Sequence, residues 1–156
     1  MSWFQQVFIA NFAATFFLAG LIWMVQVVHY PLFNDVGKEN YIRYHQRHQN
    51  NISLIVGPVM LIELATAILL IWAIDERIDR TLVYVGLGLV LLIWLSTALI
   101  QVPCHEKLAR GFDPVAYRWL VNSNWIRTIA WTARGWIVVA MLFGLLTKVE
   151  TQMVSQ

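Results

Sequence analysis

The stretch LVYVGLGLVLLIWLSTALIQV, from Leu82 to Val102, carries no charged residue. A helix needs about 20 consecutive apolar residues to cross the hydrocarbon core of a bilayer, and this stretch meets that length. Three further stretches are comparably long and apolar: Val7 to Val28, Ile52 to Ile74 and Ile126 to Leu146. None of them alternates between polar and apolar residues, so helices are favoured over barrel strands. The sequence therefore predicts an all-α fold, an integral membrane antiparallel four-helix bundle, with residues 1–156 forming a single domain.

The composition of the chain supports a membrane location. Hydrophobic residues make up 59% of the 156 residues and charged residues only 13%, whereas soluble domains average about 25% charged residues. So few polar side chains could not cover a surface that faces water. The net charge of +2 is small and no basic cluster is dense, so we expect no nucleic-acid partner. The first apolar stretch has no basic leader and is longer than the core of a signal peptide, so we expect it to be a retained helix.

The charged loops predict how the bundle is oriented. The turn from Asp75 to Arg80 is too short for anything but a hairpin, so the second and third spans should be neighbours. The connections from His29 to Asn51 and from Pro103 to Asn124 are longer and carry more basic residues. These are Lys38, Arg43, Arg47, Lys107, Arg110 and Arg118, against Arg77, Arg80 and Lys148 on the other side. By the positive-inside rule we expect the two long loops in the cytoplasm and both termini on the outer side of the membrane.

All four histidines fall at the cytoplasmic end of the predicted bundle. His29 ends the first span, His45 and His48 precede the second, and His105 follows the third. The i, i+3 spacing of His45 and His48 places two imidazoles side by side on one helix face, as a pair of metal ligands requires. Neutral imidazoles suit iron, copper or zinc. We therefore predict a metal site formed by all four histidines, with haem b (most readily between His29 and His105) or interfacial side chains without a ligand as alternatives.

Polar residues continue below the histidines on helix faces that should point into the bundle. On the first span the face is Asn11, Thr15, Leu18, Ile22, Gln26 and His29. Glu63 and Arg134 lie at comparable depth in the second and fourth spans, and an unpaired charge in hydrocarbon costs several kcal/mol, so we predict that they pair. Arg127 shares the face of Arg134. These charges either fix the helix register or line a polar pocket for the head of a quinone-like, phenolic or lipid molecule.

Three segments carry a resemblance to a known family. They are AGLIWMVQVVHYPLF (19–33), YHQRHQNNISLIVGPVMLIEL (44–64), and QVPCHEKLARGFD (101–113) followed by LVNSNWIRTIAWTARGW (120–136). In the order of their features they resemble small four-span bacterial membrane proteins of the anthrone-oxygenase-like family. The shared features are a polar end to the first span, a proline in the second, Pro103 to Glu106 after the third, and a helix rich in Trp and Arg.

The resemblance implies oxidation of an aromatic substrate with little use of a cofactor. Where that family has an Asn-Glu pair, this chain has His105 and Glu106, and His45 and His48 have no counterpart in it. The segment AGLIWMVQVV with the later tyrosine is also similar to the haem-binding four-span protoporphyrinogen oxidases of bacteria. That similarity assigns a role to no residue of this chain.

Together these features predict a metal-dependent membrane oxidoreductase whose hydrophobic substrate enters from the bilayer. The histidines would hold iron or copper. Glu63 or Glu106 would act as acid, base or further ligand, and Arg127 and Arg134 would orient the substrate. The alternatives are a haem b electron-transfer protein and a non-catalytic subunit or solute-conducting bundle whose polar stripe lines a path.

The loop charges generate a prediction about topology. A reporter fused after Gln156 is expected on the outside of the membrane, and a cysteine-accessibility tag near Gly111 on the inside, because the basic loops stay in the cytoplasm. Labelling of intact cells with a membrane-impermeant reagent measures both positions. Reversal of both results would overturn the orientation and leave the four spans unaffected.

Overall fold

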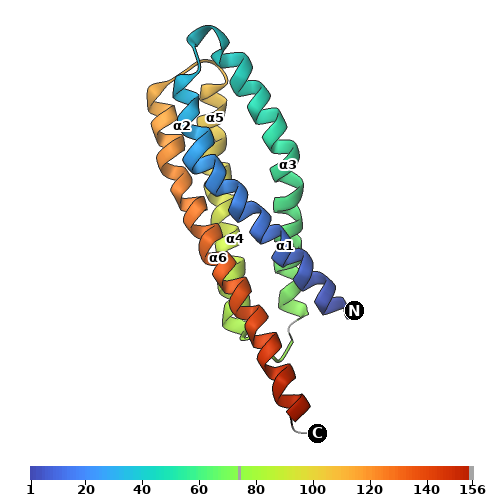
Figure 1. The fold of residues 1–156 in the computed structure, drawn as a ribbon. Coiled ribbons are helices and arrows are strands. Elements are labelled where there is room, and N and C mark those ends of the chain that lie inside the picture. The colour runs from blue at the N-terminus through green and yellow to red at the C-terminus, as the bar shows by residue number, and fades with distance from the viewer. Residues whose placement is uncertain (74, 155–156) are drawn as a thin grey trace.

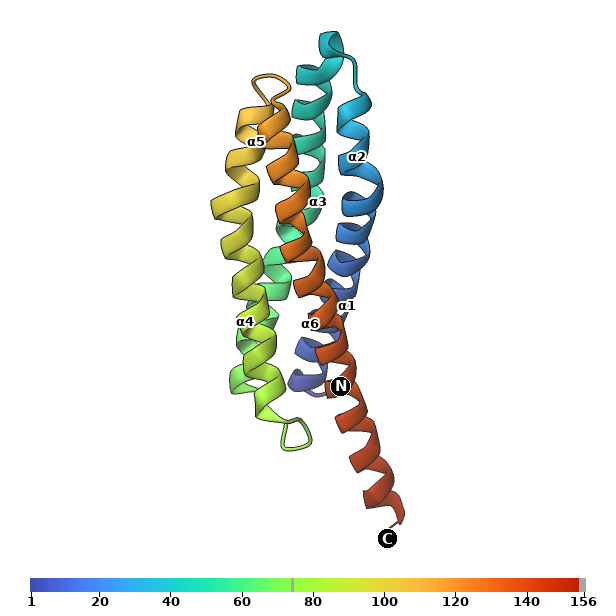
Figure 2. The same cartoon turned by 90° about the vertical axis from the view of Figure 1, so that its left-hand side faces the viewer.

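The computed structural model describes residues 1–73 and 75–154, and the side chains of residues 1–73 and 75–147. In this part of the chain four helical segments are long and apolar enough to cross a membrane: Trp3–Asp35, Lys38–Trp72, Arg80–Leu108 and Pro114–Thr147. They run antiparallel, so the beginning of the first segment and the end of the fourth lie at the same end of the bundle (Figures 1 and 2). The predicted all-α, four-span architecture is confirmed. Ile74, expected to be the last residue of the second span, lies outside the described residues.

Local changes of the backbone divide these spans into shorter elements. The first span consists of α1 (Trp3–Met24), η1 (Val25–His29), α2 (Tyr30–Leu32) and η2 (Phe33–Asp35). The second is α3 (Lys38–Trp72), and the third consists of α4 (Arg80–Ser96), η3 (Thr97–Gln101) and α5 (Val102–Leu108). The fourth is α6 (Pro114–Val154). Both α1 and α4 pack against α3 and α6, so each helix has two neighbours and one diagonal partner. The C-terminal end of α6 continues past the other helices (Figure 2).

Two π-helical segments, η1 and η3, interrupt the first and third spans near the histidines. The residue after each segment donates its backbone N–H to a carbonyl five residues earlier, from Tyr30 to Val25 and from Val102 to Thr97. A proline follows directly in both cases, Pro31 or Pro103. Proline cannot donate a backbone hydrogen bond, and in a regular α-helix its ring clashes with the carbonyl four residues earlier. The wider π-turn relieves this clash. Such π-bulges often occur at functional sites.

The turn between α5 and α6 fixes the position of the segment that carries His105. Gly111 has a φ of 152°, in the region that favours glycine. The Asp113 carboxylate accepts hydrogen bonds from the backbone N–H groups of Val115 and Ala116 at 2.8 and 2.9 Å, and it lies 3.0 Å from Lys107 Nζ. The Ala116 N–H and the Lys107 ammonium hold the pKa of Asp113 below its usual value, because both favour the charged carboxylate.

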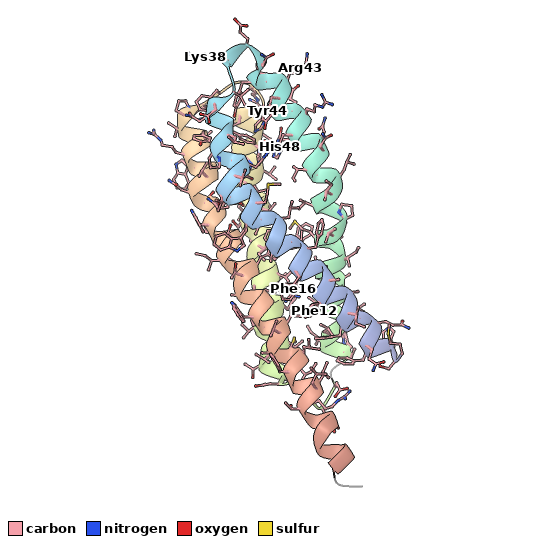
Figure 3. All side chains as sticks on the ribbon, in the orientation of Figure 1. Phe12, Phe16, Lys38, Arg43, Tyr44 and His48 are labelled. Atoms are coloured by element: carbon pink, nitrogen blue, oxygen red, sulfur yellow. The ribbon has the colours of Figure 1, made fainter. Side chains whose placement is uncertain are left out.

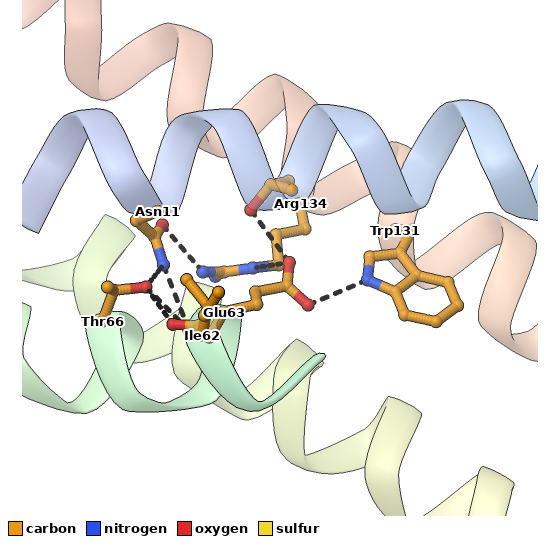
Figure 4. A network of polar contacts seen from close by, with 7 residues as sticks. Asn11, Ile62, Glu63, Thr66, Trp131 and Arg134 are labelled. Carbon is orange, nitrogen blue, oxygen red and sulfur yellow. Dashed lines mark hydrogen bonds and ion pairs between the residues drawn. The ribbon is translucent and has the colours of Figure 1, made fainter. Parts of the chain in front are cut away.

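A buried ion pair joins three helices in the middle of the bundle (Figure 4). Arg134 Nε lies 2.9 Å from Glu63 Oε1, and the side chains are only 3% and 1% exposed. The Glu63 carboxylate also accepts hydrogen bonds from Thr15 Oγ1 at 2.8 Å and from Trp131 Nε1 at 3.0 Å. Arg134 Nη2 donates to Asn11 Oδ1 at 2.9 Å. The pair predicted from the sequence is confirmed, and both carboxylate oxygens have partners, as a charge in this environment requires.

The predicted inward faces are confirmed as well. The residues of the predicted inward face of the first span, from Asn11 to Gln26, are all buried, and His29 at the end of this face is half-buried. On α6, Arg127, Trp131 and Arg134 are all buried. Gly86 of α4 leaves room for the Arg134 guanidinium, since a Cβ atom there would lie 2.9 Å from Arg134 Nη1. Helical periodicity therefore predicts the rotation of these helices correctly through the middle of the bundle.

The buried pair can be tested by a double-mutant cycle. Glu63→Ala and Arg134→Ala are each expected to lower the free energy of unfolding by roughly 3–5 kcal/mol, because each leaves the partner charge buried and unpaired. The double variant should lose much less than the sum of the two. Equilibrium unfolding in mixed detergent measures all three, with Leu61→Ala as the control, since that side chain is 57% exposed to the outside of the bundle. Simple additivity would contradict the contact.

Candidate functional site

The four histidines meet at the end of the bundle where the first span joins α3 and α5 leads into α6. Figure 3 labels His48 at this end, close to Tyr44 and below Lys38 and Arg43. The ring centroids are 4.3 Å apart for His29 and His48, 5.2 Å for His45 and His105, and 6.1 Å for His48 and His105. The structure thus brings together the four imidazoles that the sequence singled out. Their role as metal ligands stays a prediction.

The imidazoles form two hydrogen-bonded pairs, each between different helices. His29 Nε2 lies 2.7 Å from His48 Nδ1, and His105 Nδ1 lies 3.1 Å from His45 Nε2. His45 and His48, adjacent on α3, have ring centroids 6.5 Å apart, and each has its hydrogen-bond partner on another helix. Two nitrogens bound to one ion at about 2.0–2.1 Å lie about 3 Å apart, so each pair has the spacing of two ligands.

A metal site also needs enough ligands to complete the coordination shell of its ion. Among the side chains of residues 1–73 and 75–147, no group of three or more His, Cys, Asp and Glu is arranged so that it could hold a metal ion. The cluster therefore consists of two imidazole pairs, and the other positions around an ion held by one pair would have to be filled by water, by a bound molecule or by movement of the other pair toward it.

A chain of hydrogen bonds links the histidines to α6. Arg127 Nη2 donates to Tyr30 Oη at 3.3 Å, and Tyr30 Oη lies 3.1 Å from His105 Nε2. A guanidinium only donates, so the arrangement that gives the Tyr30 proton a partner has it donating to His105. His105 Nδ1 then donates to His45 Nε2, and His45 Nδ1 is left buried without a hydrogen-bond partner. Such an unsatisfied polar atom calls for an explanation, and a binding role is one.

Arg127 is the charged residue at the inner side of this cluster, and its side chain is buried. Its Nε donates to Asn124 Oδ1 at 2.9 Å, Nη2 contacts the same oxygen, and Nη1 donates to Thr97 Oγ1 at 3.4 Å. Asn124 in turn donates to Gln26 Oε1 at 2.7 Å. The ion pairs among the described side chains are Arg77–Asp75, Lys107–Asp113 and Arg134–Glu63. The charge of Arg127 is therefore met by neutral acceptors alone.

A cavity of about 280 Å³ lies against these groups. Its polar wall contains Tyr30, His48, Thr97, Gln101, His105 and Arg127, and its apolar wall includes Ile22, Val56, Met60, Trp94 and Trp131. Ser53 and Val102 also line it and are exposed on the outside of the bundle, so the cavity reaches the surface between α3 and the η3–α5 segment. In a bundle that spans a membrane, that surface would face lipid.

A second cavity, of about 310 Å³, lies beside the first. It is lined by His29, Tyr44, Arg47 and Asn51, and by His48, which also belongs to the wall of the first cavity. His48 therefore lies between the two spaces, and its partner His29 lines only the second.

Of the four side chains predicted to be catalytic, Arg127 alone lines the 280 Å³ cavity. Glu63 and Arg134 bond to each other below it, although Trp131, which donates to Glu63, belongs to the cavity wall. Glu106 is exposed on α5, and the structure does not bring it into the histidine cluster. Sequence reasoning did not identify Tyr30 as a site residue. Its position directly after His29 was the available signal, but a single tyrosine at the end of a span is ordinary in membrane proteins.

Comparisons with known proteins give no match to a protein-family model, to a curated protein or to a solved structure. The resemblance to the anthrone-oxygenase-like family therefore stays a prediction. Sequence and structure together define a class, an integral membrane protein of four antiparallel spanning helices with a polar site at one end.

The hydrogen-bond chain predicts the effect of removing one hydroxyl. Tyr30→Phe takes an acceptor from Arg127 and a partner from His105, so we expect a loss of about 1–3 kcal/mol in the free energy of unfolding. Unfolding in mixed detergent measures the change. The matched control is Tyr84→Phe, whose side chain is exposed on α4, and it should have little effect. Equal stability of the Tyr30→Phe variant and the unmodified protein would show that the chain is not formed.

Proposed function

We propose that the protein is a membrane oxidoreductase that holds iron or copper at its histidine pairs and acts on a hydrophobic small molecule in the adjoining cavity. The supporting observation is the position of His48 and His105. Each belongs to an imidazole pair, and each lines the 280 Å³ cavity. An ion at either pair would therefore be next to a molecule in the cavity, which is the arrangement that electron transfer between them needs.

The donor set suits a transition metal. Imidazole nitrogens bind iron and copper well, and the distances of 2.7 and 3.1 Å within the pairs are close to those between two ligands of one ion. Imidazoles that bind a metal generally donate their other N–H to an oxygen in the surrounding protein. With a metal on Nδ1, His105 would carry its proton on Nε2 and would donate to Tyr30 Oη, 3.1 Å away, instead of accepting from it. A bound iron or copper would supply one-electron chemistry next to the cavity.

The pairs favour a non-haem ion over haem b. Two axial imidazoles bind from opposite sides of a porphyrin, with their ligating nitrogens about 4 Å apart and the ring between them. His29 and His105, the residues predicted for haem, each contact a different imidazole instead, and the direct contact within each pair leaves no gap for a porphyrin. We therefore expect no Soret band in the purified protein.

The cavity supports a hydrophobic substrate of the quinone-like, phenolic or lipid kind. Ligand sites of this kind are mainly apolar with a few polar groups that orient the molecule. Here the polar groups are at one end, and Arg127, Gln101 and Thr97 would hold the head of the substrate while Val56 and Met60 contact its body. From the loop charges we place the histidine end at the cytoplasmic face of the bacterial inner membrane.

The metal content of histidine variants tests this proposal. Protein purified without chelator is expected to contain iron or copper, and His45→Ala, His105→Ala and the double variant His45→Ala/His48→Ala should each lose metal while the bundle still folds, since these residues lie outside the central ion pair. Inductively coupled plasma mass spectrometry measures the content. Asn50→Ala, exposed on the same helix, is the control. Full metal content in the double variant, or no metal in the unmodified protein, would refute the site and favour a non-catalytic subunit.

A further inference from the structure

The two buried arginines of α6 differ in how their charges are compensated. Arg134 and Arg127 are 2% and 7% exposed. Arg134 forms an ion pair with Glu63, whereas no Asp or Glu in the described part of the chain lies within 4.0 Å of Arg127. Buried charges in proteins are normally paired, because loss of hydration costs several kcal/mol that neutral acceptors offset only in part. The surroundings of Arg127 therefore lack one negative charge.

The donors of Arg127 are also incompletely used. A guanidinium has five N–H donors, one on Nε and two on each Nη. Nε donates to Asn124, Nη2 donates to Asn124 and Tyr30, and Nη1 donates once, to Thr97 at the long distance of 3.4 Å. The second N–H of Nη1 has no acceptor among the side chains and backbone that the structure describes. A cation with a free donor thus remains at this point.

That cation lines the 280 Å³ cavity, and the other lining residues agree with an anion next to it. Gln101 and Thr97 add neutral polar groups near Arg127, and no Asp or Glu belongs to the described lining. The rest of the wall is mainly apolar, with Ile22, Met60 and Trp131 among its members. The cavity therefore combines one uncompensated positive charge with a hydrophobic body and access from the bilayer.

We propose that the cavity binds a hydrophobic molecule with an oxyanion head, a carboxylate or a phenolate, whose negative charge pairs with Arg127. The inference deepens the proposed function by naming the substrate class, and it rests on that function for the role of the cavity as the substrate site. Binding of the head needs only Arg127 and the cavity, so it occurs with or without metal. A bidentate carboxylate suits the planar guanidinium especially well, because two parallel N–H donors match its two oxygens.

Matched pairs of ligands test the inference on the full-length protein in nanodiscs of neutral phospholipid, after chelator treatment. The probes are 2-naphthoate against the neutral 2-naphthamide, and anionic 2-hydroxy-1,4-naphthoquinone against neutral 1,4-naphthoquinone. At least one anion is expected to bind about tenfold or more tightly than its neutral counterpart, since a hydrogen-bonded charge contributes more than a neutral group. The first pair detects a carboxylate site and the second a phenolate-like one. Equal affinity within both pairs would overturn the inference without any variant being made.

Variants of two arginines then locate the preference. Arg127→Gln should abolish the preference for the anion, and Arg127→Lys should retain part of it. Arg110→Gln, at an exposed arginine of the loop before α6, should leave it unchanged. Persistence of the preference in Arg127→Gln would also overturn the inference.

Metal analysis of the same preparations before chelation separates the two proposals. An anion preference in protein that contains no metal would support the anion site and reject the redox function. Metal-loaded protein with no anion preference would support the redox function and reject the anion site.

Discussion

The pairing of Glu63 with Arg134 is the interaction on which the rest of the bundle depends. A charge removed from water must be compensated within the protein, and in this bundle three of the four spans contribute to that compensation through Asn11, Glu63 and Arg134. The contact fixes the rotation of α1, α3 and α6 relative to one another. Once those rotations are fixed, the same helix faces carry Gln26, His48 and Arg127 toward each other at the end of the bundle, where the candidate site lies.

The local backbone then determines the details of the site. The segments η1 and η3 each add a wider turn before a proline, and they occur just where the first and third spans reach the histidines. His29 and Tyr30 lie at the end of the first of these turns, and His105 lies in the short helix after the second. Rigid packing in the middle and irregular helices at one end together produce a cavity that reaches the lipid-facing surface but keeps its polar groups inside.

Much of the fold could be predicted from the sequence, because the length of an apolar run and the cost of a bare charge are strong constraints in a membrane. The four spans, the inward face of the first helix and the Glu63–Arg134 pair follow from them. The gathering of the histidines at one end follows from antiparallel topology. The hydrogen-bond partners within that cluster cannot be predicted in this way. A π-turn shifts the helical phase of every residue after it, so a 3.6-residue period does not predict the contact of His48 with His29. A cavity and the outward position of Glu106 leave no pattern in the sequence at all.

We propose that the histidine end is a redox metal centre beside an apolar cavity that ends at Arg127. X-ray absorption spectroscopy at the iron or copper edge of the purified protein tests this assignment most directly, because imidazole rings give a characteristic multiple-scattering pattern. We expect imidazole coordination of the bound metal, with a change in its nearest ligands when a substrate analogue fills the cavity. A metal bound without imidazole, or protein that takes up no iron or copper at all, would contradict it.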